Sequence, residues 1–230
     1  MSLMEEYLNK IIEKLKDVHK NEEEKIEEAA SIISEAIINK KHVYVFGCTH
    51  SSILAEEIFY RAGSLAEYEP IFVPGLSVTG KDIVSCSRFE KDDVLIVIST
   101  SGRNAVPVEV AMGSKEKGLK LIIITSKAYE SFTSNHSSGK KLQDIEADVL
   151  IDNHVDVGDA VVKVGENYMG PVSTIIGAFI LHSISIKVAQ KLLEKGIKPN
   201  VFASANVPGN VQKNKEILEN DSFKRTFLIP

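Results

Sequence analysis

Residues 94–104 read VLIVISTSGRN, and this stretch decides the fold that we expect. The first five residues are aliphatic and four of them are β-branched, a pattern typical of a strand that is buried on both faces and belongs to a parallel sheet. Small residues follow from Ser99 to Gly102, and a helical stretch begins near Asn104. The segment therefore predicts a buried strand, a tight turn and a helix in succession.

The turn after this strand has two interpretations. Backbone N–H groups at a helix start carry partial positive charge, and the hydroxyls of Ser99, Thr100 and Ser101 add neutral donors, so the turn could surround a phosphate. Alternatively, it is only a turn with a helix cap. An earlier loop of the same kind favours anion binding, because the predicted strand 42–47 (HVYVFG) runs through residues 48–52 (CTHSS) into a predicted helix 53–62. This loop is not a dinucleotide fingerprint, since Thr49 and Ser52 stand where glycines are needed.

Further strands are predicted at 68–73, 119–125 and 147–152, and further helices at 105–117, with Gly118 as its C-cap, and 173–195. Strands that alternate with helices predict an α/β fold, a doubly wound five-stranded parallel sheet of order 2-1-3-4-5. Residues 76–90 predict a loop with a short helix, and the Ser-rich segment 127–142 predicts a mobile loop near the ligand-binding edge. Residues 153–171 show no regular period and contain acidic and histidine residues whose spacings fit no metal-site template: His154, Asp156, Asp159 and Glu166.

Residues 4–40 form an N-terminal helical extension in this interpretation. Apolar residues recur at spacings of three and four on both sides of a charged interruption, and Asn21 with Glu24 resembles a capping box, so we expect two helices that meet near residue 21. Their apolar stripes could pack on the sheet, or the first helix could cross to a partner subunit. We expect a homodimer or homotetramer, because this extension and the apolar helix 173–195 carry more apolar surface than one sheet face covers.

Composition narrows the class of protein further. The 230 residues suit one α/β domain, predicted at 41–195 and followed by a tail at 196–230 that holds a short polar helix. The net charge of −5 gives no general attraction to nucleic acid or anionic membranes. Two cysteines are too few for a disulfide framework and lack metal-ligand spacing. With no apolar run long enough to span a bilayer and no signal peptide, the chain is predicted to be cytoplasmic. We also expect no cofactor and no bound metal.

In the predicted strand order, both loops lie at the carboxyl ends of neighbouring strands, on either side of one crevice. At this point the sequence resembles the SIS, or sugar isomerase, family of phosphosugar isomerase and phosphosugar-binding domains. Its first loop has the form G-x-G-x-S, which stands here as Gly47 to Ser51 with Thr49 at the second glycine. Its second has the form S-x-S-G-x-T, which stands here as Ser99 to Asn104. The resemblance covers roughly residues 40–195 and implies that a set of small polar residues contacts a sugar phosphate: Ser51, Ser52, Ser99, Ser101 and Asn104.

Within this family the sequence looks closest to phosphoheptose isomerase and N-acetylmuramic acid 6-phosphate etherase. Phosphoheptose isomerases use a Glu on the helix after the first loop and a His on the last helix, and the matching positions here hold Arg61 and, in approximate register, His182. Glu57 lies one turn before Arg61 and could replace the base, or the two could form only an exposed ion pair. His182 could be catalytic or merely buried at an interface, and His50 is a further candidate acid beside the phosphate. The resemblance implies an enzyme that isomerises a phosphorylated sugar or cleaves its ether, or alternatively a sugar-phosphate sensor without a base.

Overall fold

The computed structural model of the chain describes residues 1–72 and 79–219. A five-stranded parallel sheet has the order β2-β1-β3-β4-β5, which confirms the predicted doubly wound fold. Its strands are β1 (Val43–Gly47), β2 (Tyr68–Pro70), β3 (Val94–Ile98), β4 (Lys120–Thr125) and β5 (Val149–Asp152). The chain runs outward from β1 to β2 and then returns to the other side of β1 to form β3. Strand order therefore reverses between β1 and β3.

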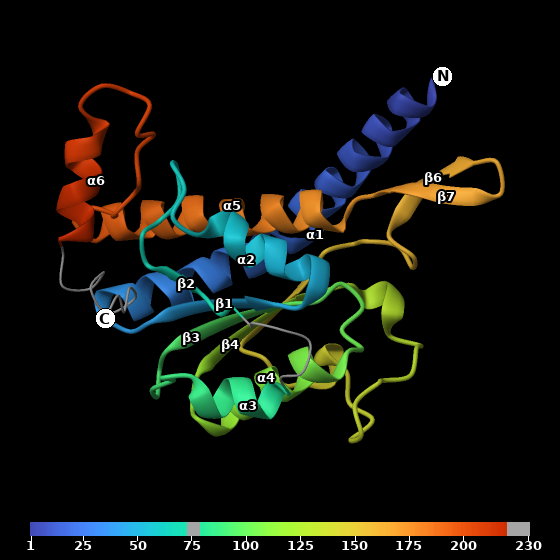
Figure 1. The fold of residues 1–230 in the computed structure, drawn as a ribbon, viewed down its shortest axis with the longest axis horizontal. Helices are drawn as coiled ribbons and strands as arrows, with labels where there is room; N and C mark the ends of the chain where they lie inside the picture. Colours follow the sequence, from blue (N-terminus) through green and yellow to red (C-terminus); the bar gives the residue numbers. More distant parts are fainter. Residues whose placement is uncertain (73–78, 220–230) are drawn as a thin grey trace.

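Helices cover both faces of the sheet (Figure 1). On one face lie α1 (Leu3–Ile38), α2 (Ser52–Ile58) and α5 (Ser173–Glu194), and on the other lie α3 (Gly80–Cys86) and α4 (Ala105–Glu116). Ile96 and Ile98 of β3 pack in the first core, whereas Leu95 and Val97 pack in the second. The continuous aliphatic run of β3 follows from this arrangement, because every side chain of a strand covered on both faces is buried.

The N-terminal extension is one continuous helix, so the predicted break near residue 21 is wrong. Asn21 does not cap a second helix; its side-chain amide donates to the carbonyl oxygen of Asp17 within α1 (2.8 Å). The charged interruption includes Glu22, whose side chain is buried and accepts hydrogen bonds from Lys25 and from the backbone of Asp152 on β5. Polar residues at this point thus belong to the contact between α1 and the sheet rather than to a helix boundary.

Several predicted boundaries are corrected. The helix after the first loop ends at Ile58 rather than Ala62, because Phe59 is extended and Tyr60 has a φ of +47°. Strand β2 ends at Pro70, after which the amide of Ile71 still donates to the carbonyl of Val45 (2.9 Å); position 73, where this strand was predicted to end, lies outside the described residues. The short helix expected between residues 76 and 90 is α3.

Residues 153–171 were predicted to be irregular, but they hold an antiparallel hairpin of β6 (Ala160–Val164) and β7 (Asn167–Pro171). Most of its side chains are exposed, so no apolar alternation marks it in the sequence. Asp159, just before the hairpin, accepts hydrogen bonds at one carboxylate oxygen from the amides of Val172 and Ser173 (2.9 and 2.8 Å). This carboxylate thereby satisfies N–H groups at the start of α5.

Helix α5 confirms the predicted long apolar helix almost to the residue. Four of its side chains, each four residues apart, are completely buried against α1 and α2: Ile176, Ile180, Ile184 and Val188. By length and composition alone α5 could cross a membrane, so the expectation that no apolar run is long enough to span a bilayer is wrong, although a core helix of a soluble protein passes the same test. After α5 the described chain ends with α6 (Asn210–Leu218), the short polar helix predicted in the tail.

Candidate functional site

The candidate site lies where β1 and β3 end beside each other. The two strands pair in parallel with Gly47 opposite Ile98, so the first loop (residues 47–52) and the second loop (residues 99–104) leave the sheet side by side. The first loop enters α2 on one face of the sheet, and the second enters α4 on the opposite face (Figure 1). A crevice at the carboxyl ends of such strands is where ligands bind in doubly wound sheets.

The first loop folds back on itself. A Cβ added to Gly47 would lie 2.3 Å from the backbone oxygen of Ser51, so only glycine allows this close approach. Thr49 has a φ of +54°, in the left-handed region that a β-branched residue rarely adopts. This is the position at which the resembling loop pattern has a glycine, so the glycine-like backbone is retained despite the Thr. Ser52 donates its hydroxyl hydrogen to the carbonyl of Thr49 (2.7 Å) and so closes the loop.

The second loop is held from outside. The carbonyl of Thr100 accepts hydrogen bonds from the Ser126 amide (2.9 Å) and the Thr125 hydroxyl (3.2 Å), both at the end of β4. The carbonyl of Gly102 accepts one from the amide of Leu142 (2.9 Å). These bonds turn the carbonyl oxygens of the loop toward the body of the protein.

The serine hydroxyls proposed to bind phosphate differ in their surroundings. Within the described ranges, no intramolecular hydrogen bond occupies the hydroxyl of Ser51 or Ser99, and Ser99 is only 6% exposed. The Ser101 hydroxyl accepts a long bond from the amide of Arg103 (3.4 Å). Asn104 precedes α4, and its side-chain oxygen accepts a long bond from Asn135 (3.5 Å). The hydroxyls of Ser51 and Ser99 are therefore unpaired among the described residues.

Gln143 is a residue that the sequence analysis missed. It lies in a short 3-10 turn, η3 (Leu142–Asp144), and its side-chain amide donates to the carbonyls of Ser101 (3.1 Å) and Ser126 (2.9 Å). No spacing or motif identifies a single glutamine more than forty positions after the carbonyl that it contacts. Only the tertiary structure brings it to the second loop.

The predicted loop 127–142 lies beside the second loop and contains a 3-10 turn, η2 (Lys127–Tyr129). The ammonium group of Lys141 donates to the carbonyls of Glu130 (2.5 Å) and Phe132 (3.1 Å) and so closes the segment. Arg103 of the second loop donates to the carbonyl of Thr133 (2.6 Å) and lies over the ring of Phe132. The segment is thus attached to the candidate site by side chains.

Two candidate catalytic residues meet in the structure. The Nε2 atom of His182 on α5 lies 3.3 Å from the Oε1 atom of Glu57 on α2. Gly177 allows the two helices to approach closely. A Cβ at this position would lie only 2.4 Å from the side chain of Leu54. Glu57 also forms the predicted ion pair with Arg61, so its carboxylate contacts both Arg61 and His182. Burial, and then the positive charge of Arg61, lower the pKa of His182 below 6.5, which favours a neutral imidazole at pH 7.

The third candidate, His50, does not bond to this pair. It occupies the exposed 3-10 turn η1 (Thr49–Ser51), and within the described part of the chain it makes no hydrogen bond or ion pair with Glu57 or His182. Its neighbour Cys48 is half-buried, and burial raises the pKa of the Cys48 thiol to about 11. The thiol is therefore protonated at neutral pH and is a poor nucleophile.

A second polar cluster lies at the end of β5. Donor atoms of Glu22, Asp152 and His154 lie within 4.8 Å of one another, close enough to hold a metal ion. Each already has protein partners, however: Glu22 pairs with Lys25 and His154, and Asp152 accepts hydrogen bonds from the amides of Lys127 and His154. An ion-pair network that attaches α1 to β5 accounts for these contacts.

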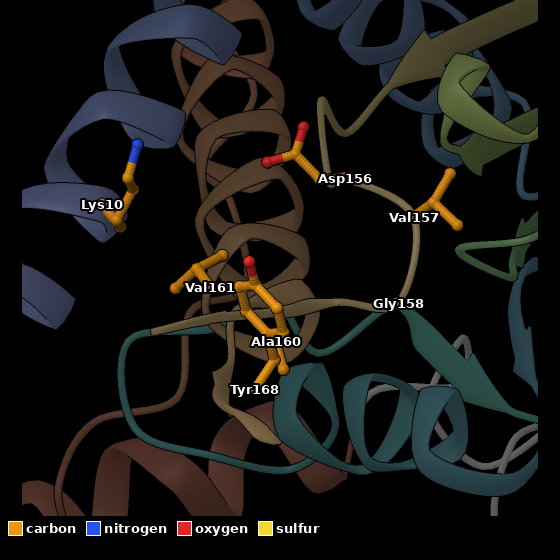
Figure 2. A pocket seen from close by; sticks show the side chains of 7 residues that line it. All are labelled: Lys10, Asp156, Val157, Gly158, Ala160, Val161 and Tyr168. Carbon is orange, nitrogen blue, oxygen red and sulfur yellow. The ribbon is translucent and has the colours of Figure 1, made fainter. Parts of the chain in front are cut away.

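A cavity of about 360 Å³ lies between the N-terminal part of α1 and the β6–β7 hairpin. Figure 2 shows its lining, in which Lys10 projects from α1 and Tyr168 from the hairpin. Asp156, also in the lining, forms an ion pair with the buried Lys14 (2.9 Å). None of the lining residues belongs to either loop, so this cavity is separate from the candidate phosphate site.

Comparison with known proteins identifies the class that this fold and crevice define. A family model described as the SIS domain matches residues 6–85 and 76–126, so the chain belongs to the SIS domain family. Over nearly its whole length it is similar to UPF0309 proteins. It is 36% identical to one from Oceanobacillus iheyensis, and the alignment covers 95% of this chain and 96% of the relative. It is 38% identical to one from Shouchella clausii, and the alignment covers 99% of this chain and 100% of the relative.

Solved structures share the fold at low sequence identity. Phosphoheptose isomerase from Neisseria gonorrhoeae is 16% identical and superposes with a TM-score of 0.54 over 80% of this chain and 95% of that protein. A phosphoheptose isomerase from Francisella tularensis is 14% identical, with a TM-score of 0.52 over 81% and 96%. At these identities the likeness concerns the fold alone.

Proposed function

We propose that this protein binds a phosphorylated sugar or amino sugar in the crevice between the first and second loops and either isomerises it or cleaves its ether. One observation supports the proposed catalysis. Glu57 lies on α2, the helix that begins at the first loop, and its carboxylate lies 3.3 Å from His182. At 1.5 Å per residue, Glu57 lies about 8 Å along α2 from Ser52. A sugar whose phosphate is bound at the loops can span that distance.

The phosphate would be bound without a fixed positive charge. The hydroxyls of Ser51 and Ser99, together with Ser101 and Asn104, would donate to its oxygens, and the start of the twelve-residue α4 adds partial positive charge. Ser52 would act through the shape of the first loop, because its hydrogen is donated to Thr49. His50, on the exposed side of the first loop, could reach the phosphate or a sugar oxygen.

The chemistry would be proton transfer. Glu57 would take a proton from the carbon beside the carbonyl while the carbonyl oxygen gains one, which forms an enediol. Return of the proton to the former carbonyl carbon, with loss of the proton from the other hydroxyl, would complete the isomerisation. In ether cleavage the same abstraction would expel the ether oxygen, which leaves with a proton. His182, neutral at pH 7, would hold Glu57 by its hydrogen bond. Arg61 would pair with the Glu57 carboxylate through the ion pair seen in the structure.

Hydrogen exchange from deuterated water tests this proposal against a sugar-phosphate sensor. The protein is incubated with a panel of hexose, heptose and amino-sugar phosphates, and deuterium at carbon is measured by mass spectrometry. The proposal expects exchange into at least one sugar that Glu57→Gln abolishes. Glu56→Gln is the matched control, because Glu56 is exposed on the same helix. Absence of exchange across the panel would instead support the sensor.

We also propose a homodimer or homotetramer acting in the cytoplasm, without nucleic acid, membrane or cofactor. Large apolar side chains at four-residue spacing are exposed along the start of α1, namely Met4 (81%), Leu8 (54%) and Ile12 (39%), and Tyr168 and Met169 are exposed on the hairpin. A patch of this kind often marks a protein interface. Light scattering should give at least a dimer mass at micromolar concentration, and a monomer mass would contradict the proposal.

A further inference from the structure

We infer that Gln143 is a positioning residue that shapes the second loop for an anion, although it need not touch the ligand itself. Its side-chain nitrogen donates to the carbonyls of Ser101 (3.1 Å) and Ser126 (2.9 Å), and so joins the second loop to the end of β4. The loop-holding part of the inference stands on these contacts alone. The anion-binding part rests on the proposed function.

Gln143 fixes the middle one of three consecutive peptide groups. The carbonyl of Thr100 is held by Ser126 and Thr125, that of Ser101 by Gln143, and that of Gly102 by Leu142. In a trans peptide the N–H points opposite to the C=O of the same plane. The N–H of Ser101 therefore points away from the end of β4. The N–H groups of Gly102 and Arg103 bond within the loop, to the carbonyl of Ser99 (3.1 Å) and the hydroxyl of Ser101 (3.4 Å).

Consecutive N–H groups next to a left-handed residue form a concavity that binds anions. Gly102 supplies that conformation with a φ of +65°, and its N–H makes a 3.1 Å bond to the carbonyl of Ser99 that closes the turn. The N–H of Ser101 has no hydrogen-bond partner within residues 1–72 and 79–219. If Gln143 released the Ser101 carbonyl, the Ser101–Gly102 peptide could rotate and the concavity would be lost.

The close fit between Gly102 and Gln143 supports this role. A Cβ on Gly102 would lie 2.3 Å from the side-chain oxygen of Gln143, so the loop needs glycine here both for its φ and for the space that Gln143 occupies. That buried oxygen has no hydrogen-bond partner among the described residues. The amino group of Gln143 therefore makes the contacts, and a side chain without N–H donors cannot replace it.

Two variants of the full-length protein test the inference, with sulfate as the probe because it remains a dianion between pH 5 and 8. Gln143→Met removes both donors at similar length, and we expect sulfate affinity to fall about three- to tenfold, as for loss of one to two neutral hydrogen bonds. Gln143→Glu, ionised at pH 7.5, should lose more affinity because it adds a carboxylate beside two carbonyls. On lowering the pH toward 5 its protonated carboxyl can donate again, so Gln143→Glu should recover affinity relative to Gln143→Met.

Amide hydrogen exchange in the protein without sulfate gives an independent measurement. Gln143→Met should accelerate exchange at Gly102 and Leu142, whose amides close the second loop. Ile123→Val, a change in the buried core of β4, serves as a control for general destabilisation and should leave sulfate affinity unchanged. The inference is overturned if Gln143→Met leaves exchange at Gly102 and Leu142 unaltered, or if Ile123→Val loses as much sulfate affinity.

The same experiments separate this inference from the proposed function. Wild-type protein that binds neither sulfate nor any sugar phosphate would contradict the proposed function and the anion-binding part of the inference together. Exchange at Gly102 and Leu142 would still decide whether Gln143 holds the loop. Sulfate binding that responds to Gln143 variants, with no deuterium exchange into any sugar, would support the inference and favour a sensor.

Discussion

The first and second loops occupy equivalent places at the ends of β1 and β3, yet they are stabilised in different ways. The first is held by its own residues, through the contact of Gly47 with Ser51 and the bond from Ser52 to Thr49. The second is held by residues from the end of β4, from η3 and from just beyond β5, among them Gln143 and Asn153. The first loop also contains a β-branched residue at positive φ, whereas the second has a glycine there.

This difference separates local from long-range control of a binding loop. A self-contained loop depends on the few residues that a motif includes, so changes within the motif should dominate its behaviour. A loop held from outside depends on the packing of distant elements and can be altered without any change in the motif.

Gly47→Ala should be the most damaging change in either loop. The new Cβ would lie 2.3 Å from a backbone oxygen that cannot move without opening the loop, so we expect the free energy of unfolding to fall by about 2–4 kcal/mol. Urea denaturation measures the loss. Gly113→Ala is the matched control, since its Cβ would meet the Val84 side chain at 2.9 Å, which can shift. Equal losses in the two variants would show that the first loop is not closed by this contact.

Ser51→Ala and Ser99→Ala compare the ligand contacts of the two loops. Each lost donor should cost about 0.5–1.5 kcal/mol, or up to about 3 kcal/mol to a charged oxygen, and so weaken sugar-phosphate binding about two- to a hundredfold. Calorimetry with the sugar phosphate and its dephosphorylated form measures the effect, and the exposed Ser137→Ala is the control. If only Ser99→Ala weakens binding, the ligand lies against the second loop alone, and the roles proposed for His50 and Glu57 must be withdrawn.

Thr49→Gly should stabilise the protein. Relief of the strained φ of +54° is worth about 1–2 kcal/mol, and the greater freedom of glycine in the unfolded chain offsets about 0.5–1 kcal/mol of it, so a net gain of roughly 0.5–1 kcal/mol is expected. Thermal unfolding tests this. Thr133→Gly, at a residue without positive φ, should only destabilise, and a loss in both variants would mean that Thr49 is not strained.

The smallest expected effect concerns the pH response of His182. Because burial and Arg61 lower its pKa in the folded protein, its contribution to stability is complete above about pH 6.5 and declines as the pH falls toward the lower folded pKa. His42 should respond in the opposite sense, since its hydrogen bond to Glu69 raises its pKa and that stabilisation is lost as the pH rises through the folded value. NMR titration of both imidazoles checks the order of the two pKa values. Arg61→Gln should raise the pKa of His182 and leave that of His42 unchanged.

Local pattern was sufficient for most of the fold. The aliphatic run of β3, the small residues after it and the alternation of strands with helices predicted the sheet order and placed both loops at one crevice. The i,i+4 spacing also predicted the ion pair of Glu57 with Arg61. Prediction failed where burial depended on distant partners: Glu22 interrupts an apolar stripe but is buried by β5. The β6–β7 hairpin has exposed strands, which leave no apolar alternation in the sequence.

Local sequence therefore specified the strands of the parallel sheet and the helices that follow the two loops, because hydrophobic periodicity and the conformational needs of glycine act over a few neighbouring residues. Which side chains meet depends on the tertiary structure. Glu57 and His182, which meet where α2 packs on α5, are 125 positions apart in the sequence. Gln143 and Ser101, joined by a hydrogen bond, are 42 positions apart. Such contacts arise from the packing of whole elements around a shared core, and no spacing rule within one segment encodes them.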